Sequence, residues 1–416
     1  MAQAMVGSSI LAIAAEIRGL KEAGTPVADM TVGDYDAGQF PIPDALRQRI
    51  HEALDRGETN YPPAPGMPSL RQAVQALIER TQGIQYPLDS IAICGGARPA
   101  LYACYRLLTN PGDEVIYPVP SWNNQNYRDV CRLKATVVPC GMETDFQPTA
   151  ELLAPHIRNA RMVVLNTPQN PSGGVMRPEE VKKFGELIVA ENQRRQNAGE
   201  KPLYCVLDQI YRSLTFGDSQ HLSPVQMVPE AAPYVLHVDG ISKFCCATGL
   251  RVGWLVGPPT IAKKAMALLT HVGAWAPRPA QAATAEFLND LPTVEAWEKD
   301  MRRRVEDRLH ALYEGFAGLA AEGFDVRAIE PKGSIFTSVR LPLQGKRLPN
   351  GQVLENSEDV RHYLLNQAAF ALVPFAAFGV PPELEDGWFR ASVGAVSLED
   401  IQAAMPRLRL ALAALR

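Results

Sequence analysis

The stretch D-G-I-S-K-F-C-C-A-T-G-L-R-V-G-W, Asp239–Trp254, directly follows a short apolar segment, Tyr234–Val238. It places one lysine, Lys243, among small and apolar residues, and the next positive charge along the chain is Arg251. Such a lysine is either solvated at the end of a strand or held in an apolar pocket, where its amine can condense with a carbonyl. The segments around it decide between these two interpretations.

Short apolar segments rich in β-branched residues are predicted to be strands: Ser90–Cys94, Glu114–Tyr117, Met162–Leu165, Tyr204–Leu207 and Tyr234–Val238. Helix-length amphipathic stretches, such as Pro99–Leu108 and Arg177–Gln193, alternate with them. This alternation predicts an α/β fold with a parallel sheet and helices on both faces. Ligands bind at the carboxyl ends of the strands in such sheets, so we expect a site at that edge.

A second, smaller α/β unit is predicted after the large one. Residues Thr293–Ala320 carry apolar side chains at helical spacing on a charged background, which indicates a long surface helix connecting two domains. Gly333–Arg340 and Ala369–Pro374 then have the pattern of strands. We expect the domain bounds to be 1–45 for an N-terminal arm, 46–290 for a large domain, and 291–416 for the connecting helix and small domain.

The composition excludes several classes of protein. The chain has 416 residues, of which 46% are apolar and 21% charged, so a sizeable core is expected. Its net charge of −4 gives no electrostatic footprint for nucleic acid, and without a run of 18 apolar residues no membrane span is expected. The beginning, M-A-Q-A-M-V-G-S-S-I-L-A-I-A-A-E, has no basic residues before its apolar patch, which favours an amphipathic helix over a secretory signal.

The cysteines and histidines suggest neither disulfides nor a metal site. The 7 cysteines include no C-x-x-C pair, and this usage is typical of reduced, buried thiols in a cytoplasmic protein. The 7 histidines include no H-x-x-x-H or H-E-x-x-H pair, so we expect no metal.

Chemically useful residues follow each predicted strand. They are the glycine turn and helix start in Cys94–Leu101, Trp122 in P-V-P-S-W, the turn N-T-P-Q-N-P-S-G-G at Asn166–Gly174, the pair Asp208 and Tyr211, and Lys243. Taken singly, each has an ordinary interpretation as a loop, a helix cap or a core aromatic. Together they supply an amine for an aldehyde, a carboxylate for a pyridine nitrogen, a flat ring for stacking and a turn for a phosphate. That set describes a site for pyridoxal 5'-phosphate.

From about Val32 to Val393 the chain resembles the class I/II aminotransferases of pyridoxal-phosphate fold type I, the aspartate aminotransferase superfamily. The resemblance implies a large domain with a mainly parallel, seven-stranded sheet. It also implies that Lys243 forms the Schiff base, that Asp208 pairs with the pyridine nitrogen, and that Tyr211 and Asn170 contact the ring oxygen. Trp122 matches the ring-stacking position. Gly96, Ala97, Arg98, Ser242 and Arg251 match positions around the phosphate, and the S-K-x-x-x-x-x-G-x-R-x-G-W motif carries the last of these.

The resemblance also implies substrate and subunit contacts. Arg390, in W-F-R-A-S-V-G, matches the arginine that binds the substrate α-carboxylate, and Gly33 matches a backbone contact beside it. Asn170 is expected to contribute to the same substrate site. Tyr61, in N-Y-P-P-A-P-G-M-P-S-L-R, matches a tyrosine that reaches the phosphate of the neighbouring subunit, which implies a homodimer with shared active sites.

The sequence departs from the family pattern at three places. Gly240 stands where many relatives have a serine, so a phosphate contact is either missing or supplied by Ser242. The stretch V-P-F-A-A-F-G is shortened before Phe378, and Arg98 occupies a place that is often glutamine.

These features predict a transaminase that moves an amino group between an L-amino acid and a 2-oxo acid by a ping-pong mechanism. A second cation in the pocket, Arg98 or Arg278, favours aspartate or glutamate as the amino acid. Two alternatives stay open at this point. One is an aminotransferase for aromatic or aliphatic amino acids, and the other is a lyase or decarboxylase that uses the same cofactor.

Overall fold

A seven-stranded sheet forms the centre of the larger part of the molecule. The structure is a computed structural model and describes residues 9–415. The strand order is β2-β8-β7-β6-β5-β3-β4. Neighbouring strands are parallel except β8, which runs antiparallel to both β2 and β7. The strands are β2 (Ile91–Cys94), β3 (Glu114–Val119), β4 (Lys134–Pro139), β5 (Ala160–Asn166), β6 (Tyr204–Asp208), β7 (Val235–Gly240) and β8 (Gly253–Val256). The prediction of a mainly parallel sheet is confirmed.

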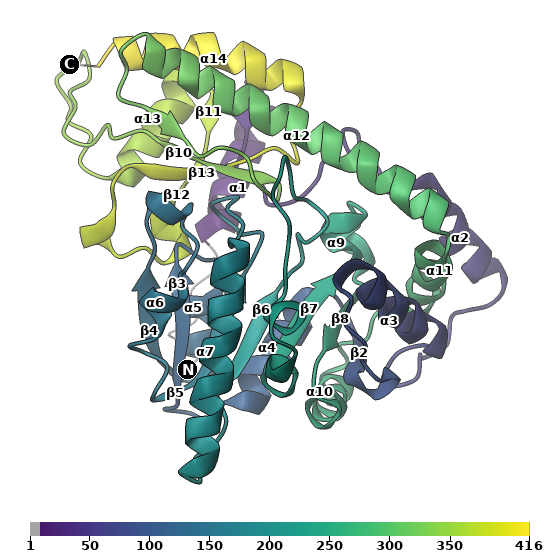
Figure 1. Cartoon of the computed structure of the whole chain (residues 1–416). Helices are drawn as coiled ribbons and strands as arrows, with labels where there is room; N and C mark the ends of the chain where they lie inside the picture. Colours follow the sequence, from purple (N-terminus) through teal and green to yellow (C-terminus); the bar gives the residue numbers. More distant parts are fainter. Residues whose placement is uncertain (1–8, 416) are drawn as a thin grey trace.

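Helices cover both faces of this sheet (Figure 1). Along β5, Val163 and Leu165 pack into one core with α3, α7 and α11, whereas Met162 and Val164 pack into another with α4 and α10. Each strand therefore buries side chains on both sides, which explains its nearly continuous apolar run. The helices of this part are α2 (Asp44–Asp55), α3 (Pro68–Gln82), α4 (Ala97–Leu108), α5 (Asn124–Cys131), α6 (Ala150–Leu153), α7 (Pro178–Asn197), α8 (Pro224–Met227), α9 (Ile241–Phe244), α10 (Pro259–Val272) and α11 (Arg278–Asn289).

Two strands of the large sheet have no counterpart among the predicted segments. β4, Lys134–Pro139, is an edge strand whose side chains are mostly partly exposed, so its apolar signal is weak. β8, Gly253–Val256, is only four residues long and follows the arginine turn directly. Both strands are held by pairing with neighbours from distant parts of the sequence, and local periodicity does not contain that information.

The smaller unit combines the two ends of the chain. Its four-stranded antiparallel sheet has the order β12-β13-β10-β9, and β1 pairs with β11 in parallel. The strands are β1 (Ala28–Asp29), β9 (Arg327–Ala328), β10 (Phe336–Arg340), β11 (Phe370–Ala371), β12 (Val373–Pro374) and β13 (Trp388–Ser392), and the helices are α1 (Ser9–Glu22), α12 (Leu291–Ala321), α13 (Ser357–Ala368) and α14 (Leu398–Ala413). The predicted domain bounds stay a prediction.

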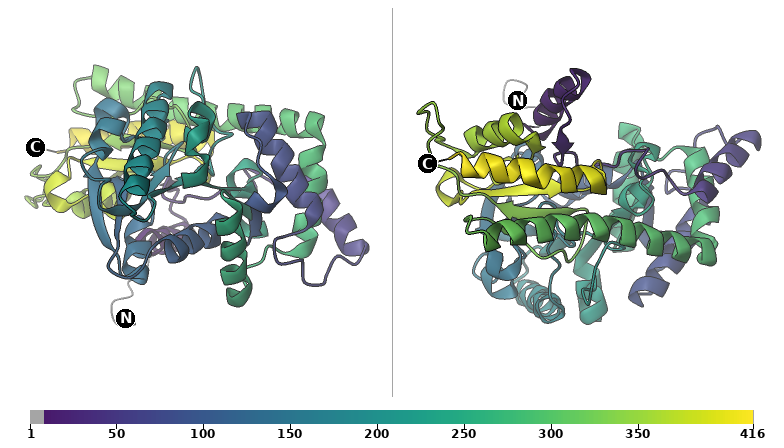
Figure 2. Two further views of the ribbon diagram at one scale, coloured as in Figure 1. Left: turned by 60° about the horizontal axis from the view of Figure 1, so that its bottom comes forward. Right: turned by 90° about the horizontal axis from the view of Figure 1, so that it is seen from above.

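The long helix α12 links the two units (Figures 1 and 2). It begins directly after α11 and buries Val305, Leu309, Leu312 and Phe316 in the core of the smaller unit. Phe40 from the N-terminal part packs against it, with the guanidinium groups of Arg304 and Arg308 4.8 and 4.7 Å from the ring centroid. The surface helix expected in this region is confirmed.

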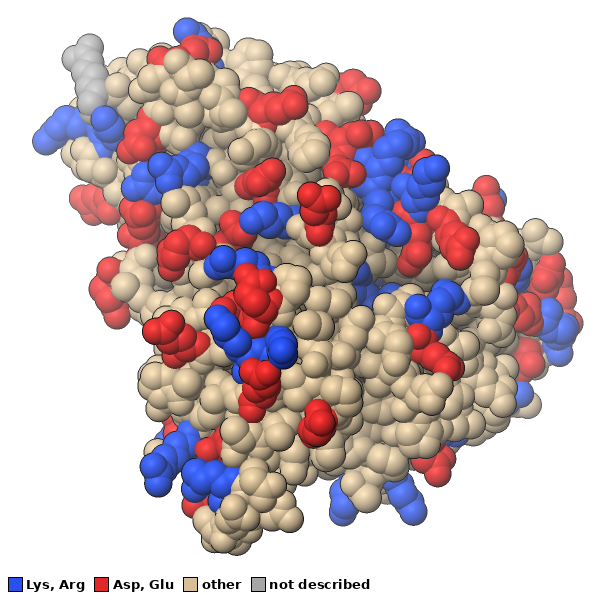
Figure 3. Space-filling model, viewed as in Figure 1, with Lys and Arg blue, Asp and Glu red and all other residues tan. Residues whose placement is uncertain are grey.

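The N-terminal helix and the buried cysteines agree with the predictions from the sequence. The expected N-terminal helix is present as α1 from Ser9 onward, and residues 1–8 lie outside the described residues. All seven cysteines are free and buried. Within residues 9–415, no helix is long and apolar enough to cross a membrane. Acidic and basic side chains are interspersed on the face in Figure 3, as the small net charge suggests.

Truncation of Leu309 tests the role of α12 as the core element of the smaller unit. Leu309 is fully buried, so Leu309→Ala leaves a cavity and should lower the free energy of unfolding by about 2–5 kcal/mol. Denaturant unfolding measures this loss. The exposed neighbour His310→Ala should change stability by less than about 0.5 kcal/mol, and equal effects of the two substitutions would contradict the assignment.

Candidate active site

Lys243 lies in the single helical turn α9, immediately after β7. Its Nζ donates a hydrogen bond to the carbonyl oxygen of Gly33 at 2.5 Å. The rings of Tyr35 and Tyr211 enclose the amine, with centroids 5.7 and 5.9 Å from Nζ. Burial disfavours the charged ammonium and lowers the pKa of Lys243 to about 8. The amine is therefore close to its neutral, nucleophilic form near physiological pH.

Asp208 ends the neighbouring strand β6 and is buried. Its Oδ1 accepts a hydrogen bond from the backbone N–H of Ile210 at 3.2 Å, so it also acts as a local cap. Burial raises the pKa of Asp208 to about 7, although that hydrogen bond opposes the shift. In the described part of the chain Asp208 makes no ion pair, and a buried carboxylate of this kind is suited to a protonated ring nitrogen, which would supply a positive charge.

The turn between β2 and α4 forms a cradle together with Arg251. Gly96 has φ +95°, and a Cβ added there would lie 2.2 Å from Nη2 of Arg251. The guanidinium donates to the carbonyl oxygens of Thr248 at 2.6 Å and Gly95 at 2.9 Å. Ala97 begins the 12-residue helix α4 directly after this turn, and the first N–H groups of a helix have no partner within it. A helix N-terminus beside an arginine is a suitable site for a phosphate.

Arg390 projects from β13 and is 1% exposed. Its guanidinium carbon lies 4.6 Å from the ring centroid of Phe336 and 4.8 Å from that of Phe378. It donates to Oδ1 of Asn170 at 3.1 Å and to the carbonyl oxygen of Thr31 at 2.5 Å, and Nε has no hydrogen-bond partner within residues 9–415. Burial lowers its pKa to about 10, so it stays charged at neutral pH.

The backbone of Gly33 lies next to both Arg390 and Lys243. A Cβ at Gly33 would lie 3.5 Å from Nη1 of Arg390, and its carbonyl oxygen accepts from Lys243. The structure thus brings Gly33, Asn170 and Arg390 to one place, although they come from the N-terminal segment, the large sheet and the smaller unit.

Trp122 and Arg98 lie against each other at the edge of the site. The guanidinium carbon of Arg98 is 4.5 Å from the Trp122 ring centroid, so it covers one face of the indole. Arg98 is exposed in the single chain. Its charge nevertheless contributes to lowering the pKa of Lys243, so the two groups are within electrostatic reach.

Arg278 is already paired. Its Nε lies 2.5 Å from a carboxylate oxygen of Glu58, and Nη1 donates to the carbonyl oxygen of Tyr61 at 3.3 Å. Tyr61 itself is 81% exposed and packs against Trp275 with ring centroids 5.2 Å apart.

The site is rich in unbalanced positive charge. No carboxylate lies within ion-pair distance of Arg98, Arg251 or Arg390 in the part of the chain that the structure describes. Ser242, expected near the phosphate, is buried beside Lys243. An anionic cofactor and an anionic substrate would supply the missing charges, and the glycine cradle and buried carboxylate fit pyridoxal phosphate.

Three further residues lie in this site and were not predicted from the sequence: Thr31, Asp34 and Tyr35. The hydroxyl of Tyr35 donates to the carbonyl oxygen of Lys243 at 3.1 Å, and the negative charge of Asp34 raises the pKa of Lys243 against the effect of burial. Thr31 supplies the carbonyl oxygen that Arg390 contacts. Their only sequence signal is that they flank Gly33.

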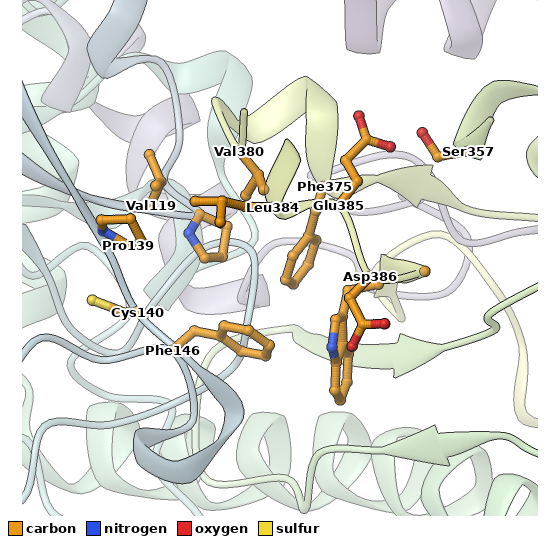
Figure 4. Close-up of a pocket in the computed structure, with 13 residues that line it drawn as sticks. Val119, Pro139, Cys140, Phe146, Ser357, Phe375, Val380, Leu384, Glu385 and Asp386 are labelled. Carbon is orange, nitrogen blue, oxygen red and sulfur yellow. The ribbon is translucent and has the colours of Figure 1, made fainter. Parts of the chain in front are cut away.

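A separate apolar cleft with about 450 Å³ of empty space, part of it open to solvent, lies between the two units (Figure 4). Val119 and Phe146 line it from the large unit, and Phe375 and Trp388 line it from the smaller one. None of the predicted site residues contributes to its lining. It therefore adds no chemical group to the site around Lys243.

Comparisons with known proteins agree with this geometry. Residues 25–408 match the family model described as aminotransferase class I and II. An aspartate aminotransferase of Rhizobium meliloti is 31% identical over 414 residues, covering 97% of this chain and 93% of the relative. One from Geobacillus stearothermophilus is 30% identical, covering 96% and 95%.

Solved structures show the same fold. The crystal structure of the aspartate aminotransferase from Rhizobium meliloti has a TM-score of 0.87 at 27% identity and covers 100% of this chain and 98% of that chain. The Thermus thermophilus aspartate aminotransferase with maleate has a TM-score of 0.86 at 26% identity, covering 99% and 98%.

Gly96→Ala tests the phosphate cradle. The added methyl group would displace the Arg251 guanidinium, so cofactor affinity should fall at least about tenfold, which corresponds to 1.4 kcal/mol. Fluorescence titration of the cofactor-free protein with pyridoxal phosphate measures the affinity. Gly249→Ala is the matched control, because nothing lies within 4 Å of its Cβ. Unchanged affinity in Gly96→Ala would contradict the cradle.

Asp208→Asn tests the burial of the carboxyl group in the cofactor-free protein. The native pKa of about 7 exceeds the ordinary value of 3.8, so the folded state holds a proton that the unfolded state loses between these values. Stability is thus lost as pH rises through this range, and ionised Asp208 is costly above pH 7. Between pH 5 and pH 8, wild type should lose about 2–3 kcal/mol relative to Asp208→Asn in denaturant unfolding. Parallel pH profiles would refute this.

Proposed function

The chain belongs to the aminotransferase class I and II family, and we propose that it transfers the amino group of aspartate or glutamate to a 2-oxo acid. The observation that carries this proposal is the pair of arginines, Arg390 and Arg98, that share a site with Lys243 and have no carboxylate partner among the described residues. The names of the relatives, which are aspartate aminotransferases, support the same substrate class.

Arg390 recognises the α-carboxylate. A planar guanidinium matches a carboxylate with two parallel hydrogen bonds, and the phenyl rings of Phe336 and Phe378 keep its plane fixed. Asn170 orients it further. An unpaired buried cation is costly, and a substrate carboxylate removes that cost on binding.

Lys243 moves the proton. When bound, pyridoxal phosphate supplies a conjugated system that takes up the electron pair released at the substrate Cα. The amine of Lys243, with its pKa lowered to about 8, is suited to accept the Cα proton as a general base. Asp208 places negative charge where the ring nitrogen would be held, and Gly96, Ala97, Ser242 and Arg251 would hold the phosphate.

Arg98 is the better of the two candidates for the distal carboxylate. Arg278 is neutralised by Glu58, whereas among residues 9–415 Arg98 is partnered by the Trp122 ring alone, and it lies within electrostatic reach of Lys243. Binding a neutral side chain would leave the Arg98 charge unpaired once the site closes. Pairing with Arg98 therefore favours an acidic side chain over a neutral one.

A homodimer with shared active sites is part of this proposal. Tyr61 is 81% exposed, although its ring is one of the large apolar surfaces of the molecule. It lies beside Trp275 and the Arg278–Glu58 pair, which hold it in place. A second copy of the chain would cover it and receive its hydroxyl group.

The substrate proposal is tested by adding single amino acids to the cofactor-loaded enzyme without a 2-oxo acid. Aspartate and glutamate should change the absorbance spectrum of the enzyme, and alanine or phenylalanine should do so far more slowly. In Arg98→Gln the rate with aspartate should fall at least about 30-fold with little change for alanine, because only the distal carboxylate loses its partner. Stopped-flow absorbance gives both rates.

Two controls make the result specific. Arg106→Gln removes an exposed arginine from the same helix and should leave both rates unchanged. Lys243→Ala should abolish the spectral change with every amino acid, and an active Lys243→Ala enzyme would refute transamination through this lysine. If phenylalanine reacts as fast as aspartate, the role of Arg98 is wrong while the transaminase stands.

A further inference from the structure

A buried ion pair joins the two turns that carry the reactive residues of this site. The first turn begins at Asp208, the last residue of β6, and contains Tyr211, and the second follows β7 and contains Lys243. In the first turn, Nε of Arg212 donates to Oδ2 of Asp239 at 2.5 Å, and Asp239 stands just before the second turn. The two side chains are only 7% and 3% exposed. The pair therefore ties the lysine turn to the turn of its proposed partners.

Asp239 uses both oxygens of its carboxylate. Oδ2 accepts from Arg212, whereas Oδ1 accepts from the backbone N–H of Gly240 at 2.7 Å. Gly240 is the last residue of β7 and directly precedes α9, the turn that holds Lys243. A Cβ at Gly240 would lie 2.6 Å from the carbonyl oxygen of Val252, so the backbone there is packed closely against the segment that leads into β8. Asp239 thus fixes the direction in which the chain leaves the sheet toward Lys243.

The helical turn α9 depends on contacts from outside for its position. It is only four residues long, and a helix of this length is not stable by itself. At its carboxyl end, the hydroxyl of Tyr35 donates to the carbonyl oxygen of Lys243 at 3.1 Å. Nε1 of Trp297 donates to the carbonyl oxygen of Phe244 at 2.7 Å. At its amino end, the corresponding restraint is the contact of Asp239 with the backbone.

Position, more than stability, is what a buried pair of this kind provides. The loss of hydration of a guanidinium and a carboxylate offsets most of their attraction, so the net gain in stability is often small. The charged hydrogen bond is nevertheless short and directional, and it defines the geometry between its two segments. Backbone pairing of β6 with β7 extends to the N–H of Gln209, which donates to the carbonyl oxygen of Val238 at 2.9 Å. Beyond that point the Arg212–Asp239 pair continues the link.

We propose that Arg212 and Asp239 are positioning residues, which hold the turn of Lys243 in a fixed place relative to Asp208 and Tyr211. They act on the amine through the backbone of Gly240, where the chain enters α9. A misplacement of about 1 Å can slow a reaction about 100-fold, so a small shift of this turn is enough to matter. The proposal rests on Lys243 being the reactive lysine of the proposed function.

Asp239→Asn tests this role without any amino-acid substrate. An amide has one acceptor oxygen where the carboxylate uses two, so either Arg212 or the N–H of Gly240 loses its partner. When pyridoxal phosphate is added to the cofactor-free protein, the amine of Lys243 condenses with its aldehyde and water is released, which changes the absorbance. The maximal rate of this change should fall at least about tenfold in Asp239→Asn.

Glu191→Gln is the matched control. Glu191 and Arg195 form another buried pair, 2.6 Å apart with side chains 7% and 4% exposed, on α7 and outside the site. The same change from carboxylate to amide should lower stability there and leave the rate of reaction with pyridoxal phosphate unchanged. If folded Asp239→Asn reacts at the wild-type rate, or if Glu191→Gln is slowed as much, the role of the pair is only structural and the proposal is overturned.

Substitutions of Arg212 give an independent answer, which decides alone if Asp239→Asn does not fold. Arg212→Met removes the donor and should slow the maximal rate with aspartate at least about tenfold, with a larger isotope effect for aspartate deuterated at Cα and little change in KM. Arg212→Gln places an amide nitrogen where Nε stands, so it should stay within about threefold of wild type. Equal rates in these two variants would overturn the proposal. If wild type itself does not react with aspartate, the proposed substrate is wrong, and the rate of reaction with pyridoxal phosphate still decides the role of the pair.

Discussion

Among the residues that the structure describes, the buried Arg390 guanidinium has only neutral partners, and much of the molecule is arranged around that charge. Phe336 and Phe378 face it, and a backbone carbonyl and an amide oxygen satisfy part of its hydrogen-bonding capacity. An isolated charge in such a place is costly, and the fold supports it through the packing of the smaller unit. A carboxylate bound there would compensate the charge, so under the proposed function the same feature that costs stability would give affinity for substrate.

The large sheet brings together the amine of Lys243, the carboxylate of Asp208 and the turn at Gly96, because these groups lie at the ends of neighbouring strands. Parallel strands end at one edge, so Asn166 and Asp208 are register partners on β5 and β6, and Lys243 follows β7. Antiparallel β8 returns beside β2, which brings Arg251 against the glycine turn. Strand topology thus determines the chemistry of the site more than any single local motif does.

Burial shifts the pKa values of Lys243 and Asp208 in opposite directions. It lowers the pKa of Lys243 and raises that of Asp208, because in each case the charged form loses hydration. Both pKa values come near neutrality, where an amine can act as a base. The carboxyl group of Asp208 is suited to bind a cationic group. Such pairs of shifted groups are typical of catalytic sites.

By itself, the sequence determined five of the seven strands of the large sheet, the long helix α12 and the residues at the ends of those strands, because these depend on local periodicity and on neighbouring turns. Lys243, Asp208 and Arg251 could be singled out in this way. Only the tertiary structure decided that Tyr35 lies against Lys243, and that Arg98 lies on Trp122 while Arg278 is paired with Glu58. These contacts join segments far apart in the chain, and their energies depend on burial and distance, which no local pattern contains.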